Sequence, residues 1–263
     1  MRGRSRWRLW VRLAFVCWAV FSTTWIANTY RTRGVPEASL RDGPSVGVAR
    51  AAGVLTLQPT SPAPAKQDAA LLFLCGSGVA VEAYVPLLRP LAEAGYAVHI
   101  VGLPFRLALL EAHKRAALQR ARDVQAAHPD VRAWVVAGHS LGGALACRLA
   151  AADPAAMSAL VLIGTTHPKQ DDLSALPLPV TKIYGTADGV APPDRMFANR
   201  GLLPPDTHWI TIEGGNHSQF GHYGHQLLDG DATVSREEQQ HLTRAALRTA
   251  LDSATAATTS TDA

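Results

Sequence analysis

After residue 68, short apolar runs alternate with helical patterns, and this alternation constrains the fold more than any other feature of the sequence. The apolar runs predict buried strands at 69–75, 97–101, 133–137, 159–163, 180–184 and 208–212. The helical patterns predict helices at 81–94, 107–128, 141–152, 192–200 and 237–251. Mostly apolar strands separated by helices indicate an α/β fold with a mostly parallel sheet covered on both faces. Sites in such sheets form at the C-terminal ends of the strands.

Composition excludes several other classes of protein. The chain has 263 residues, of which 48% are hydrophobic and 17% charged, so one full-sized domain with a large core is expected. A fully disordered chain would have fewer apolar residues. Three cysteines are too few for a disulfide scaffold, and a single long apolar stretch excludes a polytopic membrane protein.

The positive net charge of +4 comes from the N-terminus. Residues 1–33 hold seven arginines and no acidic residue, and the 18 basic and 21 acidic residues of the remaining chain leave a net charge of −3. That remainder has no basic patch interleaved with aromatic residues. We therefore expect no nucleic-acid partner.

The same N-terminal segment has the pattern of a membrane-targeting signal. Five arginines precede the uncharged stretch 13–28, and Trp7, Trp10, Trp25 and Tyr30 lie near its ends. This pattern predicts a signal anchor that contacts the membrane through residues 9–30, with the domain outside the cytoplasm. A cleaved signal peptide, which would leave the protein secreted, and a soluble amphipathic arm are the alternatives.

Composition also sets the expected boundaries. We expect an N-terminal signal segment at 1–33, a linker at 34–53, one domain at 54–252 and a disordered tail at 253–263, where the sequence is SATAATTSTDA.

The sequence Gly138-His139-Ser140-Leu141-Gly142 follows a predicted strand and opens a predicted helix. This G-x-S-x-G pattern in strand–turn–helix context is typical of a nucleophile elbow, in which the serine is lifted above the sheet. The alternative is that Ser140 only caps the helix, but a cap does not need a glycine on each side.

A serine hydroxyl needs a base to become a nucleophile, and in chains with this elbow an acid and then a histidine follow it. Asp188 follows the strand at 180–184, and His217 follows the strand at 208–212. We assign Ser140 as nucleophile, His217 as general base and then acid, and Asp188 as the group that orients the imidazole.

Other residues could fill these roles. The rival acids are Asp171, Asp172 and Asp194, and the rival bases are His222 and His225. The three histidines after residue 216 could suggest a metal site, but no nearby carboxylate or cysteine completes a ligand set. We expect no metal and no cofactor.

The oxyanion of an acyl-transfer intermediate needs two N–H donors. The N–H of Leu141, the residue after the nucleophile, is the first candidate. The second should come from the loop after the first core strand, where Ser77 is the first choice and Gly78 the second. A plain glycine-rich turn is the alternative for this loop.

With these residues in place, the sequence resembles the α/β-hydrolase superfamily, and in particular its small bacterial branch, α/β hydrolase fold-5, which is similar to dienelactone hydrolases and small carboxylesterases. The resemblance covers about residues 50–250 and rests on AGHSLGGALA, KIYGTADGV and GGNHSQFGHYGHQLLDGD. In that branch the last stretch follows the catalytic histidine, which favours His217. Two positions depart from the family pattern, namely Cys75-Gly76-Ser77 in place of Pro-Gly-Gly and His222 in place of Asp.

The resemblance implies hydrolysis of a small ester, thioester or amide without a cofactor. The segment between the predicted strands ending at Ile163 and starting at Val180 is too short for a large cap domain, so we expect an open site. The alternatives are a non-catalytic binding protein of the same fold, or an acyltransferase that uses the same triad.

Overall fold

The computed structural model describes residues 3–61 and 63–261. Residues 1–2 of the expected signal segment and 262–263 of the expected tail lie outside this described part. The helices are α1 (Gly3–Thr29), α2 (Pro64–Gln67), α3 (Val85–Glu93), α4 (Glu111–Ala127), α5 (Leu141–Ala152), α6 (Pro193–Phe197) and α7 (Arg236–Thr261). The strands are β1 (Val46–Ala51), β2 (Val54–Pro59), β3 (Ala69–Leu74), β4 (Ala97–Val101), β5 (Ala133–His139), β6 (Ala159–Ile163), β7 (Val180–Gly185) and β8 (His208–Ile212).

The strands form one sheet in the order β1-β2-β4-β3-β5-β6-β7-β8. Strands β3 to β8 are parallel, whereas β1 and β2 form an antiparallel hairpin at one edge. The expected mostly parallel sheet is therefore confirmed. The C-terminal ends of β3, β5, β7 and β8 meet at one edge, which is the edge where the candidate site residues lie.

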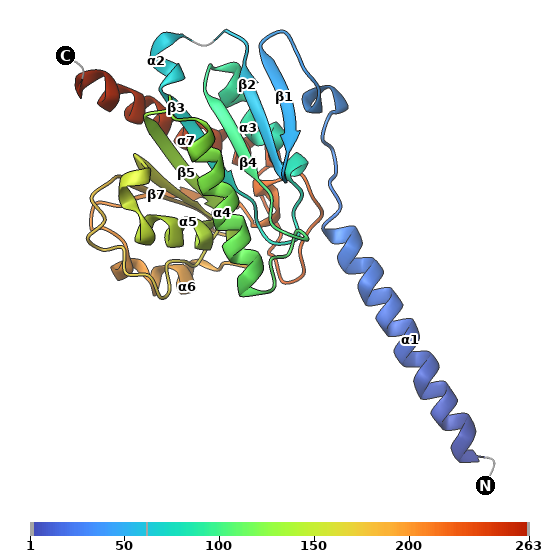
Figure 1. Cartoon of the computed structure of the whole chain (residues 1–263). Helices are drawn as coiled ribbons and strands as arrows, with labels where there is room; N and C mark the ends of the chain where they lie inside the picture. Colours follow the sequence, from blue (N-terminus) through green and yellow to red (C-terminus); the bar gives the residue numbers. More distant parts are fainter. Residues whose placement is uncertain (1–2, 62, 262–263) are drawn as a thin grey trace.

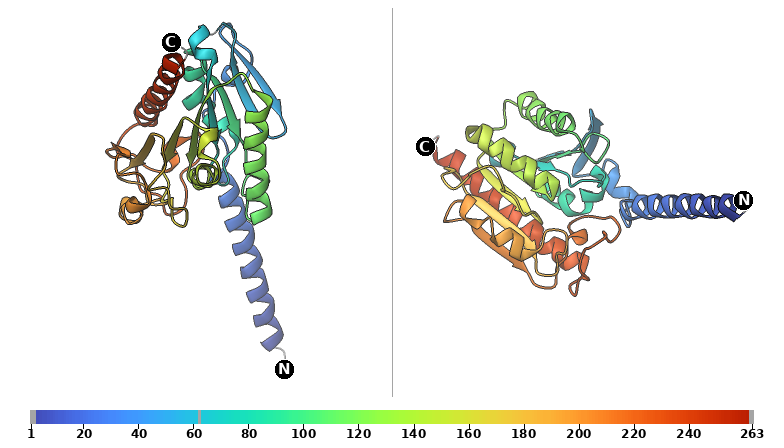
Figure 2. Two further views of the ribbon diagram at one scale, coloured as in Figure 1. Left: turned by 60° about the vertical axis from the view of Figure 1, so that its left-hand side comes forward. Right: turned by 90° about the horizontal axis from the view of Figure 1, so that it is seen from below.

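Helices cover both faces of the sheet, as expected (Figure 2). Helices α3 and α7 pack on one face, and α4 and α5 pack on the other. Every residue of β3 is buried, which explains why this strand is a continuous apolar run in the sequence. Residues 164–179 form a loop without helix or strand, so the expected absence of a large cap is confirmed.

The structure corrects three expected boundaries. Strand β1 lies inside the expected linker at 34–53, so the sheet begins at Val46. Helix α7 continues to Thr261 through most of the expected disordered tail, because Ala254 and Thr255 are buried against the domain. Helix α4 begins only at Glu111, after a loop that holds residues 102–110.

Helix α1 projects away from the domain (Figure 1). The stretch Arg6–Thr29 is long and apolar enough to cross a membrane, which a signal anchor and a signal peptide would both satisfy. The end of the helix nevertheless contacts the domain, because the carbonyl of Thr29 accepts a hydrogen bond from the Gly224 N–H at 2.8 Å. Thr29 itself is buried.

Candidate active site

Ser140 occupies a sharp turn between the last residue of β5 and the first residue of α5. Its φ of +54° and ψ of −118° lie in a region that residues with a side chain rarely adopt. Such a conformation costs about 1–3 kcal/mol and persists only where the surroundings impose it. The turn places the partly exposed Ser140 at the C-terminal edge of the sheet.

The flanking glycines are required by close backbone contacts. A Cβ atom on Gly138 would lie 2.3 Å from the backbone carbonyl of Gly142. A Cβ on Gly142 would lie 2.0 Å from the carbonyl oxygen of Leu74 at the end of β3. The glycines of the motif therefore let the strand, the turn and the helix approach more closely than any side chain would allow.

His217 and Asp188 form a buried pair on the loops after β8 and β7. The Nδ1 atom of His217 lies 2.9 Å from Oδ2 of Asp188, and both side chains are completely buried. Because a carboxylate only accepts hydrogen bonds, this contact favours the tautomer with the proton on Nδ1 and the lone pair on Nε2. Among the described residues, that Nε2 atom has no hydrogen-bond partner. It is thus the basic nitrogen left available to a substrate or a nucleophile.

The second carboxylate oxygen of Asp188 is held by the backbone. Oδ1 accepts hydrogen bonds from the N–H groups of Val190 at 2.9 Å and Ala191 at 2.6 Å. These contacts fix the carboxylate so that Oδ2 faces the imidazole. By contrast, Asp194 is exposed on α6 and Asp172 is exposed on a loop, where its carboxylate accepts from the Ser174 N–H. Asp171 is only partly buried, and Asp188 alone among the four acids faces a histidine.

Asp229 joins the two loops that carry this pair, although no role for it was predicted from the sequence. Its carboxylate accepts from the N–H groups of His217 at 3.1 Å, Ser218 at 2.8 Å and Gly189 at 3.3 Å, and from the Ser218 hydroxyl at 2.6 Å. The carboxylate therefore ties the residue after Asp188 to the backbone of His217. Asp229 is part of the stretch on which the family resemblance rests, and this is the one signal in the sequence that includes it.

His139 lies directly beside the imidazole of His217, with 4.5 Å between the ring centroids. Burial, together with the neighbouring His217, lowers the pKa of His139 well below its usual range. The hydroxyl of Tyr84 lies 2.8 Å from Nδ1 of His139 and accepts a hydrogen bond from the Gly76 N–H at 3.0 Å. His139 is therefore a neutral ring that packs against His217, and Tyr84 connects it to the loop after β3.

That loop supplies the second candidate oxyanion donor. The N–H of Gly78 donates to the carbonyl of Arg106 at 2.7 Å, so it is already engaged. In the part of the chain that the structure describes, the N–H groups of Ser77 and Leu141 have no acceptor, and both residues are partly exposed. This difference favours Ser77 over Gly78 as the partner of Leu141.

The remaining histidines lie apart from the pair. His222 Nε2 is 3.2 Å from Oε1 of Gln240 on α7, and His225 Nε2 is 3.1 Å from the Asp229 carbonyl. Within residues 3–61 and 63–261, no group of three or more His, Cys, Asp or Glu side chains could hold a metal ion. Burial raises the pKa of the Cys147 thiol to about 12 and raises that of Cys75 as well, so neither is a reactive thiolate.

Several solved structures are similar to this chain. A serine hydrolase without a lid from Xanthomonas campestris is 17% identical, with a TM-score of 0.56, and the match covers 81% of this chain and 96% of that one. A CIB-like hydrolase from Thermoplasma acidophilum is 15% identical, with a TM-score of 0.57 and coverages of 78% and 97%. A membrane phospholipase A, a bacterial virulence factor, is 14% identical, with a TM-score of 0.57 and coverages of 94% and 98%. At these identities the similarity establishes the fold.

No curated protein sequence matches this chain. A family model, however, matches residues 70–241, which include the turn at Ser140 and the pair of Asp188 and His217. The matched region contains β4 to β8, all of β3 except its first residue, and the C-terminal edge described above. The chain therefore belongs to the alpha/beta hydrolase family.

Proposed function

We propose that the chain is a serine hydrolase that cleaves a carboxylic ester, or a related thioester or amide, through an acyl-enzyme on Ser140. The observation that carries the proposal is the buried pair of His217 and Asp188, whose free Nε2 lies on the same edge as the strained turn at Ser140. His99 and His139 also have a buried ring nitrogen without a partner among the described residues. His217 differs from them because its other ring nitrogen lies against a buried carboxylate.

In the first half of the reaction, the Ser140 hydroxyl attacks the carbonyl carbon while its proton passes to Nε2 of His217. The N–H groups of Leu141 and Ser77 donate to the oxyanion of the tetrahedral intermediate. When this intermediate collapses, the bond to the leaving alcohol breaks and the alcohol takes the proton from His217. Asp188 stabilises the imidazolium formed in between.

In the second half, a water molecule attacks the acyl-enzyme while His217 accepts its proton. Collapse of the second intermediate releases the carboxylic acid and returns the proton to Ser140. Loop 164–179 does not cover the site with a cap, so the substrate enters from an open edge. No cofactor takes part in these steps.

We further infer that α1 is an uncleaved signal anchor that places the domain outside the cytoplasm. The arginines before the apolar stretch favour the cytoplasmic side. The Arg33 N–H donates to the His222 carbonyl at 2.9 Å, and Tyr30 packs on the loop at Gly78. A cut at residues 29–33, directly after the apolar stretch, would fall within these contacts with the domain, which favours an uncleaved segment.

The test uses the full-length chain in detergent, treated with a fluorophosphonate probe, which labels activated serines. We expect labelling of the wild type and of Ser174→Ala, a control serine on loop 164–179, and no labelling of Ser140→Ala. Turnover of p-nitrophenyl esters of short and long acyl chains should follow the same pattern. A folded wild type that resists the probe, or Ser140→Ala with wild-type turnover, would overturn the proposal.

A further inference from the structure

Helix α1 reaches the domain without a spacer. The uncharged stretch 13–28 spans about 24 Å as a helix, whereas the hydrocarbon core of a bilayer is about 30 Å thick. The whole stretch is therefore needed inside the membrane. The next residue, Thr29, is already buried against the domain. The face of the domain around Thr29 must then lie at the bilayer surface, if α1 is the anchor proposed above.

Two loops beside this junction expose large apolar side chains. On the loop before α4, Phe105 is 81% exposed and Leu109 is 73% exposed. On the loop after His217, Leu228 is 80% exposed. Phe105 and Leu228 have positive φ values of 53° and 71°, which is a strained way to present a side chain to water. Clusters of exposed apolar side chains on a soluble surface mark interaction sites.

Both loops are attached to the candidate active site. The hydroxyl of Ser77 donates to the Leu107 carbonyl at 3.0 Å, so the loop before α4 borders the proposed oxyanion donor. A Cβ on Gly189, the residue after Asp188, would lie 2.1 Å from the Leu228 carbonyl oxygen. The loops that carry these apolar side chains therefore border the site rather than a remote surface.

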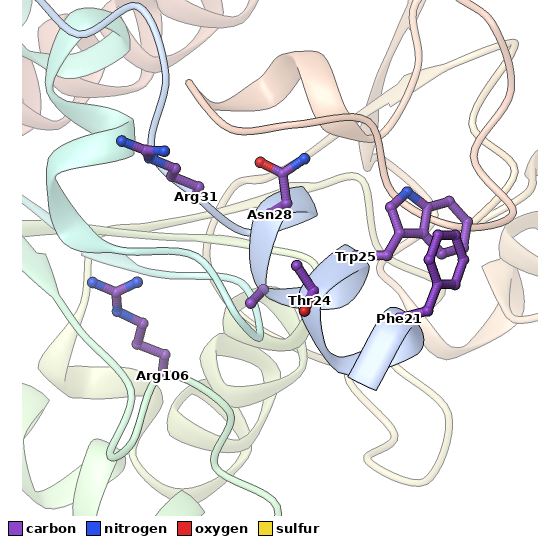
Figure 3. Close-up of a pocket in the computed structure, with 7 residues that line it drawn as sticks. Phe21, Thr24, Trp25, Asn28, Arg31 and Arg106 are labelled. Carbon is purple, nitrogen blue, oxygen red and sulfur yellow. The ribbon is translucent and has the colours of Figure 1, made fainter. Parts of the chain in front are cut away.

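A groove of about 580 Å³ lies between α1 and the first of these loops (Figure 3). Phe21 and Trp25 of α1 line one part of it, and Arg31 and Arg106 line another. Among the described residues, neither guanidinium has a hydrogen-bond or ion-pair partner. The aromatic rings at one side of the groove match the acyl region of a lipid at the membrane interface, and the unpaired arginines at the other side match its phosphate.

From these contacts we propose that the rim of the active site lies in the outer interface of the bilayer, and that the substrate is an acyl ester of a membrane lipid. The apolar loops at 105–110 and 227–228 enter the interface, and Arg31 and Arg106 bind lipid phosphates. The lipid reaches Ser140 from the membrane without crossing water. This inference rests on the proposed hydrolase activity and names the substrate class of the same site.

The position of the loops is tested by fluorescence in proteoliposomes of phosphatidylglycerol and phosphatidylcholine. A single cysteine replaces Phe105 or Leu228, and a third variant carries it at the exposed Ala126, at the far end of α4, as a control. All three variants also carry Cys17→Ser, and the remaining cysteines, Cys75 and Cys147, are buried. We expect an NBD label at 105 or 228 to be quenched several-fold more by nitroxide-labelled lipids than the label at 126. Equal quenching at all three positions would overturn the proposal.

The substrate class is tested by the ratio of two activities in the same proteoliposomes, namely release of fatty acid from the bilayer lipid and turnover of a soluble short-chain ester. We expect Leu109→Ser with Leu228→Ser to lower this ratio about tenfold. Arg106→Gln should lower it too, and Arg122→Gln, an exposed arginine on the same helix as Ala126, should not. A wild type that cleaves only the soluble ester would overturn the proposed lipid substrate but not the proposed hydrolase activity. A wild type that cleaves neither substrate would overturn the hydrolase activity, and the quenching result would then decide the membrane position by itself.

Discussion

The Nδ1 atom of His217 lies 2.9 Å from Oδ2 of Asp188, with both side chains shielded from water. In this environment the carboxylate determines which imidazole nitrogen carries the proton, since Oδ2 is the acceptor that faces Nδ1 among the described residues. The backbone N–H groups of Val190 and Ala191 hold the carboxylate in that orientation. The pair is therefore organised before any substrate binds.

Replacing Asp188 with Asn tests this organisation. The amide would present an N–H to Nδ1, so the imidazole would carry its proton on Nε2 and could not act as the base. We expect kcat for ester hydrolysis to fall about 10⁴-fold with little change in KM. The matched control is Asp194→Asn, an exposed carboxylate on α6, which should keep wild-type turnover. The reverse result would assign the acid to Asp194.

The carboxylate of Asp229 should be essential for the shape of the site. Asp229→Ala removes an acceptor from four backbone N–H groups and one hydroxyl, and hydrogen bonds to a charged group each contribute about 1.5–3 kcal/mol. We expect the free energy of unfolding to fall by about 2–4 kcal/mol and turnover to fall with it, because the loop of His217 is released. Denaturant unfolding measures the first effect. Asp231→Ala, the exposed neighbour, should change neither.

The parallel part of the sheet was predictable because buried strands are continuous apolar runs in the sequence. Strands β3 to β8 agree with the predicted runs to within two residues. Strands β3 to β7 are almost wholly buried and therefore mostly apolar, whereas the edge strand β8 exposes His208 and Thr211 between its apolar residues. The hairpin of β1 and β2 was not predicted. At the edge of the sheet β1 exposes its last residues, including Arg50, so it lacks a continuous apolar run.

The candidate site was only partly predictable for a related reason. Ser140 directly follows β5, and Asp188 and His217 lie on the loops that follow β7 and β8, so the parallel topology brings these positions to one edge. Tyr84 and Asp229 act through contacts with residues far from them in sequence, so nothing in their local sequence indicates a role. The tail was mistaken for disorder because its Ala and Thr residues resemble low-complexity sequence, although some of them are buried in α7.

Two substitutions of Ser140 should differ in stability although neither variant can form an acyl-enzyme. Ser140→Ala keeps a Cβ at a φ of +54°, whereas Ser140→Gly removes the clash that makes this conformation costly. The relief of about 1–3 kcal/mol exceeds the greater entropy of glycine in the unfolded chain. We therefore expect Ser140→Gly to be about 1 kcal/mol more stable than Ser140→Ala in denaturant unfolding. Equal stabilities would show that the turn is not strained at this residue.

Acid should destabilise the fold through its buried histidines, of which His99 is the clearest. On β4, His99 lies 3.1 Å from the Thr56 hydroxyl, and burial together with the nearby His128 lowers its pKa to about 4. Above pH 6.5 the ring is neutral in the folded and unfolded chains, so its contribution to stability is complete. Between pH 6.5 and about pH 4 only the unfolded chain binds the proton, and stability falls by up to about 3 kcal/mol.

The measurement is the difference in unfolding free energy between pH 7 and pH 4.5. A change in stability that a substitution causes equally at both pH values cancels in this difference. His99→Gln should reduce this difference, because the glutamine does not titrate. Part of the difference should remain, since burial also lowers the pKa of His139 and, to about 4, that of His167. His241→Gln, at an exposed position on α7, should leave the wild-type difference intact. An acid sensitivity that His99→Gln does not alter would assign the effect to the other buried histidines.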